Sequence, residues 1–182
     1  MPLYFITGNK NKFEEVKAVI SEVNQLDIDL PEVQDIDAKR IIEKKLLEAV
    51  HHHKGSFIVE DTSLYLACLN GFPGPLIKWL EKAVGIEGIW TLAKALGNTQ
   101  AEAKTIIGYA KSHDELYFFE GIVKGSIVAQ RGTKDFGWGP IFQPEGHRET
   151  FGEMSREEKM KIGMRGQALA KLKEFIKTTV TN

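Results

Sequence analysis

The spacing of apolar residues in the first third of the chain predicts strands and helices in alternation. Residues 3–6 and 57–59 are short apolar runs, mainly of β-type residues, and such runs are typical of strands buried on both faces of an α/β sheet. Between them, apolar residues spaced three and four apart predict an amphipathic helix after residue 12 and another over residues 38–53. Residues 26–30 alternate apolar and polar positions and predict a half-exposed strand. The alternation favours an α/β fold.

The second half of the chain predicts helices first and then a run of strands. Residues 76–80 resume a helical pattern, and a further helix is expected over residues 87–96, with Gly97 placed to end it. Three β-rich segments follow, over residues 105–110, 116–120 and 122–129. Short polar turns separate them, and residues 112–115 are the clearest hairpin turn. We therefore expect an antiparallel meander attached to the α/β part.

The last part of the chain predicts a helical region with an interruption. Ser155 and Glu158 form a capping-box pattern that opens it. Gly163 and Gly166 weaken any continuous helix, because glycine lowers helix stability. A break or kink is therefore expected between residues 161 and 167.

Composition limits the classes of protein to which the chain can belong. Its 182 residues suffice for one domain, or for one domain with a lobe, and its 42% hydrophobic content is ordinary for a globular protein. The formal net charge of −1 argues against a broad surface for nucleic acid or for an anionic membrane. Cys68 is the single cysteine, which favours a reducing compartment. With no apolar run near the roughly 20 residues of a membrane span and no signal-peptide pattern, we expect a cytoplasmic protein.

Two carboxylates, Glu60 and Asp61, directly follow the apolar run at residues 57–59. If the strand ends there, they lie beyond the carboxyl end of a strand, where ligands bind in open α/β sheets. Hard oxygen ligands suit Mg²⁺, which takes one or two carboxylates together with phosphate oxygens of a substrate. The same residues would equally well begin a turn or cap a helix. This stretch alone leaves both interpretations open.

A polar turn over residues 7–12 links the first strand to the first helix. A helix N-terminus at such a turn presents backbone N–H groups and a favourable dipole to an anion. Lys10 and Lys12 would add positive charge for phosphate. The spacing of a Walker loop is absent. A polar turn before a helix is more often structural than functional, so both interpretations stay open here as well.

A glycine-rich loop over residues 131–140 contains two aromatic residues, Phe136 and Trp138. This composition suggests backbone that a ligand approaches closely and a flat ring that stacks on a base. By contrast, the three histidines at residues 51–53 are consecutive at a helix end and point in different directions. They favour a solvated helix end over a metal site.

The order of these motifs resembles that of the inosine triphosphate pyrophosphatase family over nearly the full length of the chain. The motifs that carry the resemblance are Thr7-Gly8-Asn9 with Lys12, Leu30-Pro31-Glu32, Val59-Glu60-Asp61-Thr62, Gly71-Phe72-Pro73-Gly74-Pro75 with Lys78-Trp79, Arg131-Gly132, Phe136-Gly137-Trp138, and Glu153-Met154 with Glu158-Lys159. Chance does not place this many motifs in one order.

The resemblance implies an α/β fold with an elongated, two-lobed mixed sheet flanked by helices, formed by a single domain over residues 1–182. The active site would lie in the cleft between the lobes, and the protein would form a homodimer. The implied activity is the Mg²⁺-dependent hydrolysis of non-canonical purine nucleoside triphosphates (ITP, dITP, XTP) to the monophosphate and pyrophosphate. Nucleic acid and membrane partners are not expected.

The resemblance also assigns roles to individual residues. Glu32 and Asp61 would be the metal-site carboxylates, and Asp61, with Glu60 beside it, would orient or deprotonate the attacking water. The triphosphate would be held by Thr7, Asn9, Lys12, Lys45 and Lys159, and the base would be contacted by Phe136, Trp138 and Arg165. Metal and ammonium groups of this kind also stabilise the charge that develops in the transition state of phosphoryl transfer.

Several positions depart from the family pattern at the base-reading end. Gly139 stands where the family usually has an aspartate before proline, and Met160 stands where it has an asparagine. Gly163-Met164-Arg165 replaces a Ser-His-Arg triplet. Loss of hydrogen-bonding partners weakens discrimination between close analogues. The sequence therefore predicts the same reaction with relaxed or altered base preference, and a non-catalytic nucleotide-binding protein is the alternative of a different class.

Overall fold

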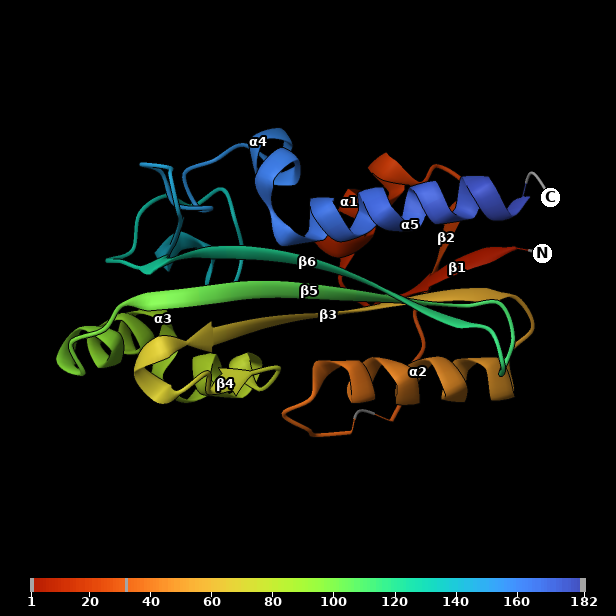
Figure 1. Cartoon of the computed structure of the whole chain (residues 1–182), viewed down its shortest axis with the longest axis horizontal. Helices are drawn as coiled ribbons and strands as arrows, with labels where there is room; N and C mark the ends of the chain where they lie inside the picture. Colours follow the sequence, from red (N-terminus) through yellow and green to blue (C-terminus); the bar gives the residue numbers. More distant parts are fainter. Residues whose placement is uncertain (1, 32, 181–182) are drawn as a thin grey trace. The chain divides into compact units, whose positions relative to one another are not determined.

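The computed structural model describes residues 2–31 and 33–180 (Figure 1). The described strands form one seven-stranded sheet with the order β2-β1-β3-β5-β6-β7, and β4 pairs with β3 beside this path. The pairs β1–β2 and β1–β3 are parallel, whereas β3–β4 and β6–β7 are antiparallel. The sheet is therefore mixed and flanked by helices, as the resemblance implied.

The helices and strands have the following bounds, in chain order. The strands are β1 (Leu3–Ile6), β2 (Val23–Leu26), β3 (Ser56–Leu66), β4 (Pro73–Gly74), β5 (Gln100–Ala110), β6 (Leu116–Ile127) and β7 (Phe142–Pro144). The helices are α1 (Lys10–Val19), α2 (Ala38–His52), α3 (Ile77–Ala95), α4 (Arg156–Ile162) and α5 (Met164–Val180), with short 3₁₀ turns at Ala67–Leu69 and Gly139–Ile141. None of the helices among the described residues combines the length and the apolar character that a membrane crossing needs.

The chain divides into two compact units. The first unit comprises Met1–Asp61, Thr105–Glu120 and Gln167–Asn182, and the second comprises Thr62–Lys104 and Gly121–Gly166. Strands β3, β5 and β6 each contribute residues to both units. Whether residues 1–182 act as a single domain stays a prediction.

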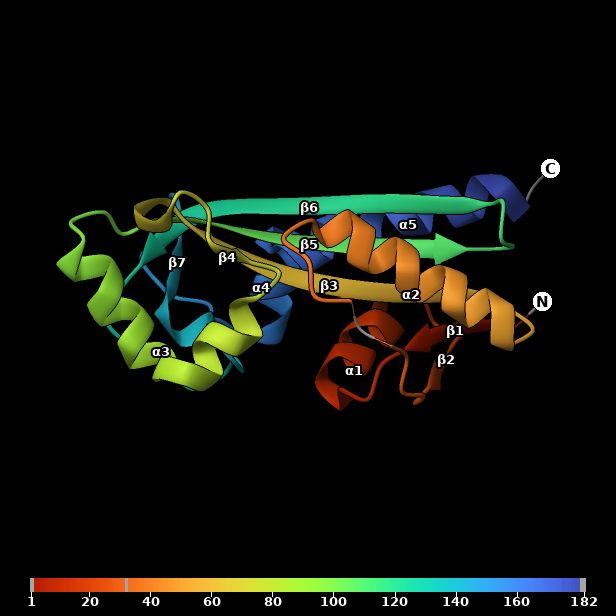
Figure 2. The same cartoon turned by 90° about the horizontal axis from the view of Figure 1, so that it is seen from below.

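The first unit has helices on both faces of its strands. Figures 1 and 2 show α2 on one face and α1 and α5 on the other. The α2 face is closed by Ile42 and Leu46, which pack against buried apolar residues of β3 and β5. On the α5 side, the Phe175 ring lies with its centroid 4.4 Å from that of Tyr117 and 5.4 Å from that of Phe119. The fully buried side chains of Ile42 and Leu46 each contribute about 1.5–3 kcal/mol through their burial.

The second unit has its own apolar core. Leu64 and Leu66 of β3 belong to one buried cluster with Ile89 of α3, and Phe142 and Phe151 stack in the same cluster with ring centroids 5.2 Å apart. Helix α3 contains a non-helical residue, Gly85, at φ 70° and ψ 171°. The two helices predicted on either side of this position are confirmed as two helical segments.

Several predicted strands differ from the structure in their bounds. The strand predicted to end at Glu60 continues as β3 to Leu66. The segments predicted at 116–120 and 122–129 are one strand, β6, because Gly121 is buried within it and does not form a turn. The sequence predicted a three-stranded meander here. The structure has two long strands instead, β5 and β6, joined by the predicted turn at 112–115.

The strand predicted at residues 26–30 is also wrong in its bounds. Strand β2 covers Val23–Leu26, and residues 27–30 are irregular. The reason is that β2 pairs only with β1, whose last residue, Ile6, lies opposite Leu26. Residues 27–30 therefore have no residue of β1 beside them with which to form strand hydrogen bonds. The break predicted between residues 161 and 167 is confirmed, since α4 ends at Ile162 and α5 begins at Met164.

Replacing Gly108 by alanine tests the packing of α2 on β5. A Cβ at Gly108 would overlap the side chains of Ile42 and Leu46. We expect Gly108→Ala to lower the free energy of unfolding by about 1–3 kcal/mol, as overpacking of a core does, measured by urea denaturation. In an Ile42→Ala background the same change should cost clearly less, because the nearest overlapping atom is gone. Equal costs in the two backgrounds would contradict this packing.

Candidate functional site

The turn after β1 is closed by its own side chains. The Thr7 hydroxyl accepts a hydrogen bond from the Asn9 backbone N–H at 3.1 Å, and the Asn9 side chain accepts one from the Lys12 N–H at 3.1 Å as the N-cap of α1. Both side chains thus have a structural use. The N–H groups of the first helical turn cannot find acceptors within the helix, so this end of α1 keeps the character of an anion site.

Glu60 and Lys12 form a largely buried ion pair in the first unit. The distance from Lys12 Nζ to Glu60 Oε1 is 3.1 Å, and the side chains are 23% and 0% exposed, respectively. A carboxylate without exposure needs such a partner, because an uncompensated buried charge is very costly. The pair connects the first turn of α1 to β3 and holds the Lys12 ammonium beside the helix terminus.

The position of Glu60 and Asp61 follows from the pairing of β1 with β3. Phe5 lies opposite Ile58, so β1 ends at Ile6 while β3 continues. The two carboxylates therefore lie just past the carboxyl end of β1, although they are in the middle of their own strand. Ligands bind at the carboxyl ends of strands in such sheets, and the strand that ends beside these two carboxylates is β1, not β3.

Alternation along β3 separates the two carboxylates. Successive side chains of a strand point to opposite faces, so Asp61 faces away from the Glu60–Lys12 pair. The two residues do not form a two-carboxylate site by themselves, and a second metal-site carboxylate has to come from another segment. The resemblance assigns that role to Glu32, which lies outside the described residues. Within the described part of the chain, no group of three or more His, Cys, Asp or Glu residues could hold a metal ion.

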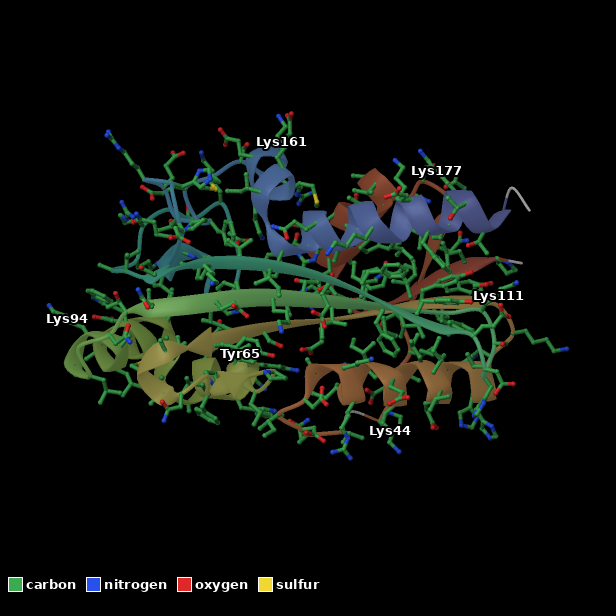
Figure 3. All side chains as sticks on the ribbon, in the orientation of Figure 1. Lys44, Tyr65, Lys94, Lys111, Lys161 and Lys177 are labelled. Carbon is green, nitrogen blue, oxygen red and sulfur yellow. The ribbon has the colours of Figure 1, made fainter. Side chains whose placement is uncertain are left out.

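Lys45 of α2 also belongs to the first unit and is half-buried. The neighbouring Lys44 is exposed and points away from the ribbon (Figure 3). Sequence spacing placed Lys45 at the edge of the apolar face, and the burial of Ile41 and Ala49 one turn away on each side agrees with this.

The glycine-rich loop of the second unit is tied to residues 150–153. The Lys134 N–H donates to the Gly152 carbonyl at 2.8 Å, and the Thr150 hydroxyl donates to the Arg131 carbonyl at 2.8 Å. Gly132 has φ +78°, and a Cβ there would overlap the backbone of Gly152. The close approach of the two segments therefore requires glycine at position 132.

The two aromatic residues of this loop have different surroundings. Phe136 is 37% exposed, whereas Trp138 is 8% exposed and belongs to the core cluster of the unit. The Trp138 ring lies edge-on to Phe142, with centroids 5.5 Å apart. Of the two rings, Phe136 is therefore the one available for stacking, and contact of Trp138 with a base stays a prediction.

Lys159 of α4 lies against this loop. Its Nζ is 2.6 Å from Asp135 Oδ1, with side chains 11% and 7% exposed, and it is 5.0 Å from the centroid of the Phe136 ring. Lys161, two residues later, is 68% exposed in its side chain and points outward (Figure 3). Sequence reasoning singled out Lys159 but missed Asp135, because nothing in the order of residues shows that 135 and 159 meet.

The other residues of the predicted base-reading end are mostly buried. Arg165 is 4% exposed and Met164 is 4% exposed, and Met164 is a member of the core cluster. The Gly163 N–H donates to the Lys159 carbonyl at 2.7 Å and ends α4. Met164 thus packs in the core of the unit, while the contact of Arg165 with a base stays a prediction.

A pocket of about 660 Å³ lies within the second unit. Its lining includes Tyr65, which Figure 3 labels, together with Lys124, Gln143 and His147. None of the site residues predicted from the sequence lines it. It is therefore separate from the groups described above.

Comparison with known proteins places the chain among nucleotide-processing enzymes. A family profile described as the Ham1 family matches residues 3–175. A protein of Schizosaccharomyces pombe named inosine triphosphate pyrophosphatase is 38% identical over 180 residues, which are 97% of this chain and 95% of that protein. One of the same name from Fusarium vanettenii is 42% identical over 177 residues, 95% of each chain. The solved structure of a HAM1 protein from Coxiella burnetii has a TM-score of 0.85 at 22% identity, covering 98% of this chain and 100% of that one, and it shares the fold.

The interactions of Glu153 predict a pH-dependent stability of the loop. Its carboxylate accepts a hydrogen bond from the Thr150 N–H at 2.8 Å and lies 3.6 Å from Arg131 Nε. The Thr150 N–H first and the Arg131 charge next hold the pKa of Glu153 below its ordinary value of 4.5. This stabilisation is present above pH 4.5 and is lost as the pH falls through the lowered native pKa.

We therefore expect Glu153→Gln to have a lower Tm than the wild-type protein at pH 7, and the difference to shrink as the pH falls below 4.5 and through the lowered native pKa. Thermal melting between pH 3 and pH 8 measures it. Glu149→Gln, an exposed position in the same segment, is the control. A Tm difference that stays constant down to pH 3 would contradict the role of the Glu153 charge.

Proposed function

The chain belongs to the Ham1 family, and on this premise we propose that it is a nucleoside triphosphate pyrophosphatase acting on non-canonical purine nucleotides such as ITP, dITP and XTP. Water attacks the α-phosphorus, the bond from that phosphorus to the bridging oxygen breaks, and a nucleoside monophosphate and pyrophosphate leave. The relatives named inosine triphosphate pyrophosphatase match 95–97% of the chain at 38–42% identity. The structural observation that carries the proposal is the Lys12–Glu60 pair at the N-terminus of α1.

The triphosphate needs several positive groups, because it carries about four negative charges at neutral pH. The N-terminus of α1 supplies backbone N–H donors and the helix dipole. Lys12, held in place by Glu60, and Lys45 on α2 add ammonium groups, which act as compact charges for phosphate. These groups also stabilise the charge that shifts to the leaving pyrophosphate. Thr7 and Asn9 would then contribute mainly by shaping the turn.

Asp61 is the proposed group that orients and deprotonates the attacking water. It is half-buried, lies just past the carboxyl end of β1, and faces away from the Glu60–Lys12 pair. Its carboxylate is therefore not on the face where Glu60 and Lys12 pair. Glu60 acts instead through Lys12.

A divalent metal, Mg²⁺ in our proposal, would be held by Asp61 and Glu32 and would supply charge stabilisation at the phosphate oxygens. The donor set fits this ion, because Mg²⁺ in phosphoryl-transfer sites uses one or two carboxylates and otherwise water and phosphate oxygens. A closed cage of protein ligands is not required. In this proposal Asp61 would also orient the attacking water.

The base would stack on Phe136, the exposed ring of the glycine-rich loop. Lys159 lies next to that ring rather than in the first unit. We therefore move it from the triphosphate set, in which the sequence placed it, to the base. Arg165 stays a candidate for the same end of the substrate.

We also infer a homodimer and a cytoplasmic location. The homodimer is supported by the resemblance to the family, and the location is supported by the single cysteine, Cys68, which suits a reducing compartment.

Replacing Asp61 by asparagine tests the catalytic assignment. We expect Asp61→Asn to lower pyrophosphate release from ITP by about 10²–10⁴-fold, the range that a positioned general base contributes, with an unchanged melting temperature. Asp114→Asn, in the exposed hairpin turn with a side chain 96% exposed, is the matched control and should keep full activity. Near-normal turnover by the Asp61→Asn protein would exclude the proposed role.

Pyrophosphate release from a panel of nucleotides tests the substrate. With Mg²⁺ present, release from ITP, dITP and XTP should be at least about tenfold faster than from ATP, and excess EDTA should abolish it until Mg²⁺ is restored. Comparable rates for every base would favour the alternative of relaxed specificity. Saturable binding of ITP without pyrophosphate release would favour the non-catalytic alternative.

A further inference from the structure

The pocket of the second unit lies on the face of its strands that is turned away from the core. Its volume of about 660 Å³ is in the usual range for a small-molecule site. Ala101 and Ala103 of β5 belong to the core cluster, so Glu102 between them points to the opposite face. Tyr65 of β3 likewise lies between two core leucines. The floor of the pocket is therefore made of outward-pointing strand side chains.

Strand pairing places three charged residues in one row across this face. The Ile127 N–H donates to the Thr99 carbonyl at 2.7 Å, so these two residues are opposite each other in the antiparallel pair of β5 and β6. Three residues further along, Glu102 is opposite Lys124. On the other side of Lys124, the Glu145 N–H donates to the Lys124 carbonyl at 2.9 Å. One lysine thus lies between two glutamates, and all three line the pocket.

Most polar side chains of the lining have no partner within the protein. Five of them make no hydrogen bond and no ion pair within the part of the chain that the structure describes: Gln100, Glu102, Lys124, Ser126 and Glu145. By contrast, the side chain of Gln143 is already used, because its amide donates to the His147 carbonyl at 2.9 Å and its oxygen accepts from Arg131. The five unpartnered side chains are available to a ligand.

These side chains define the charge of a ligand that fits. At neutral pH they carry two negative charges and one positive charge. Both carboxylates repel a polyanion such as a nucleoside triphosphate, and an apolar molecule would leave the charged groups without partners. The described residues contain no group of three or more His, Cys, Asp or Glu that could hold a metal ion. The complementary ligand carries one carboxylate and two cationic groups.

We propose that this pocket binds a basic amino acid, with L-arginine as the representative ligand. The ligand carboxylate pairs with Lys124, while its α-ammonium and guanidinium groups pair with Glu102 and Glu145. Neighbouring strands lie about 4.8 Å apart, so the backbones of the two glutamates are about 10 Å apart, a separation that their side chains and an extended arginine together bridge. The proposal is independent of the proposed function, because it uses no group assigned to the nucleotide.

Isothermal titration calorimetry on the full chain tests the class of ligand. We expect L-arginine to bind saturably at one site per chain. L-Citrulline has nearly the same shape but an uncharged side chain, and agmatine lacks the carboxylate, so each should bind at least about tenfold more weakly. The absence of saturable binding of L-arginine, or equal binding of L-arginine and L-citrulline, would overturn the proposal.

Two variants test which groups contact the ligand. The double variant Glu102→Gln/Glu145→Gln should lose the preference for L-arginine over L-citrulline, and Lys124→Gln should lose the preference for L-arginine over agmatine. Glu149→Gln changes an exposed position of the same segment that does not line the pocket, and this control should keep both preferences. Unchanged preferences in both test variants would overturn the proposal. If melting curves show that a variant does not fold, the three ligands on the wild-type protein decide.

Further outcomes separate this inference from the proposed function. Both variants should release pyrophosphate from ITP as the wild-type protein does. A wild-type protein without turnover that still prefers L-arginine over L-citrulline and agmatine would overturn the enzyme assignment and support the inference. Competition between ITP and L-arginine would overturn the inference.

The oligomeric state shows whether a second copy covers this face instead. Size-exclusion chromatography with light scattering measures it for the wild-type protein and for Lys124→Gln. The same state in both proteins supports a pocket that is open to a small ligand. A wild-type dimer that becomes a monomer in Lys124→Gln would show that two copies bury this face, and it would overturn the inference.

Discussion

A buried carboxylate has to be neutralised, and each of the two units meets this constraint with a lysine. In the first unit Glu60 is paired with Lys12, and in the second Asp135 is paired with Lys159. Both pairs join segments that are far apart in the sequence: the first joins helix α1 to strand β3, and the second joins a loop to helix α4. Since the penalty of an unpaired buried charge is several kcal/mol, each pair fixes where its ammonium lies.

In the proposed function, the two ion pairs are assigned to different ends of the substrate. Lys12 stands beside the N-terminus of α1, where backbone donors and the helix dipole favour phosphate. Lys159 Nζ lies over the ring of Phe136, 5.0 Å from its centroid, and this is the ring proposed to stack on the base. In the proposed function, an ammonium held by a carboxylate would neutralise phosphate charge in the first unit and would lie at the base-binding end in the second. The surroundings of each ammonium make the difference.

Local sequence patterns correctly predicted those features whose cause lies within a few neighbouring residues. The capping box at Ser155 and the break near Gly163 depend on residues within about one helical turn, and the structure has both. Strand bounds were less accurate, as β3 and β6 show, because the length of a strand depends on its neighbours in the sheet. Glu60 and Asp61 were placed at a strand end for this reason. They do lie at one, but it is the end of β1.

The sequence by itself determined the α/β class, the buried central strand, the polar turn before α1 and the motifs that match the Ham1 family, since each of these depends on neighbouring residues. Only the tertiary structure decided that Lys12 pairs with Glu60, that Trp138 is buried while Phe136 is exposed, and that Asp135 pairs with Lys159. The physical reason is that burial, strand pairing and buried ion pairs depend on contacts between residues distant in the chain. Spacing along the sequence carries no record of those contacts.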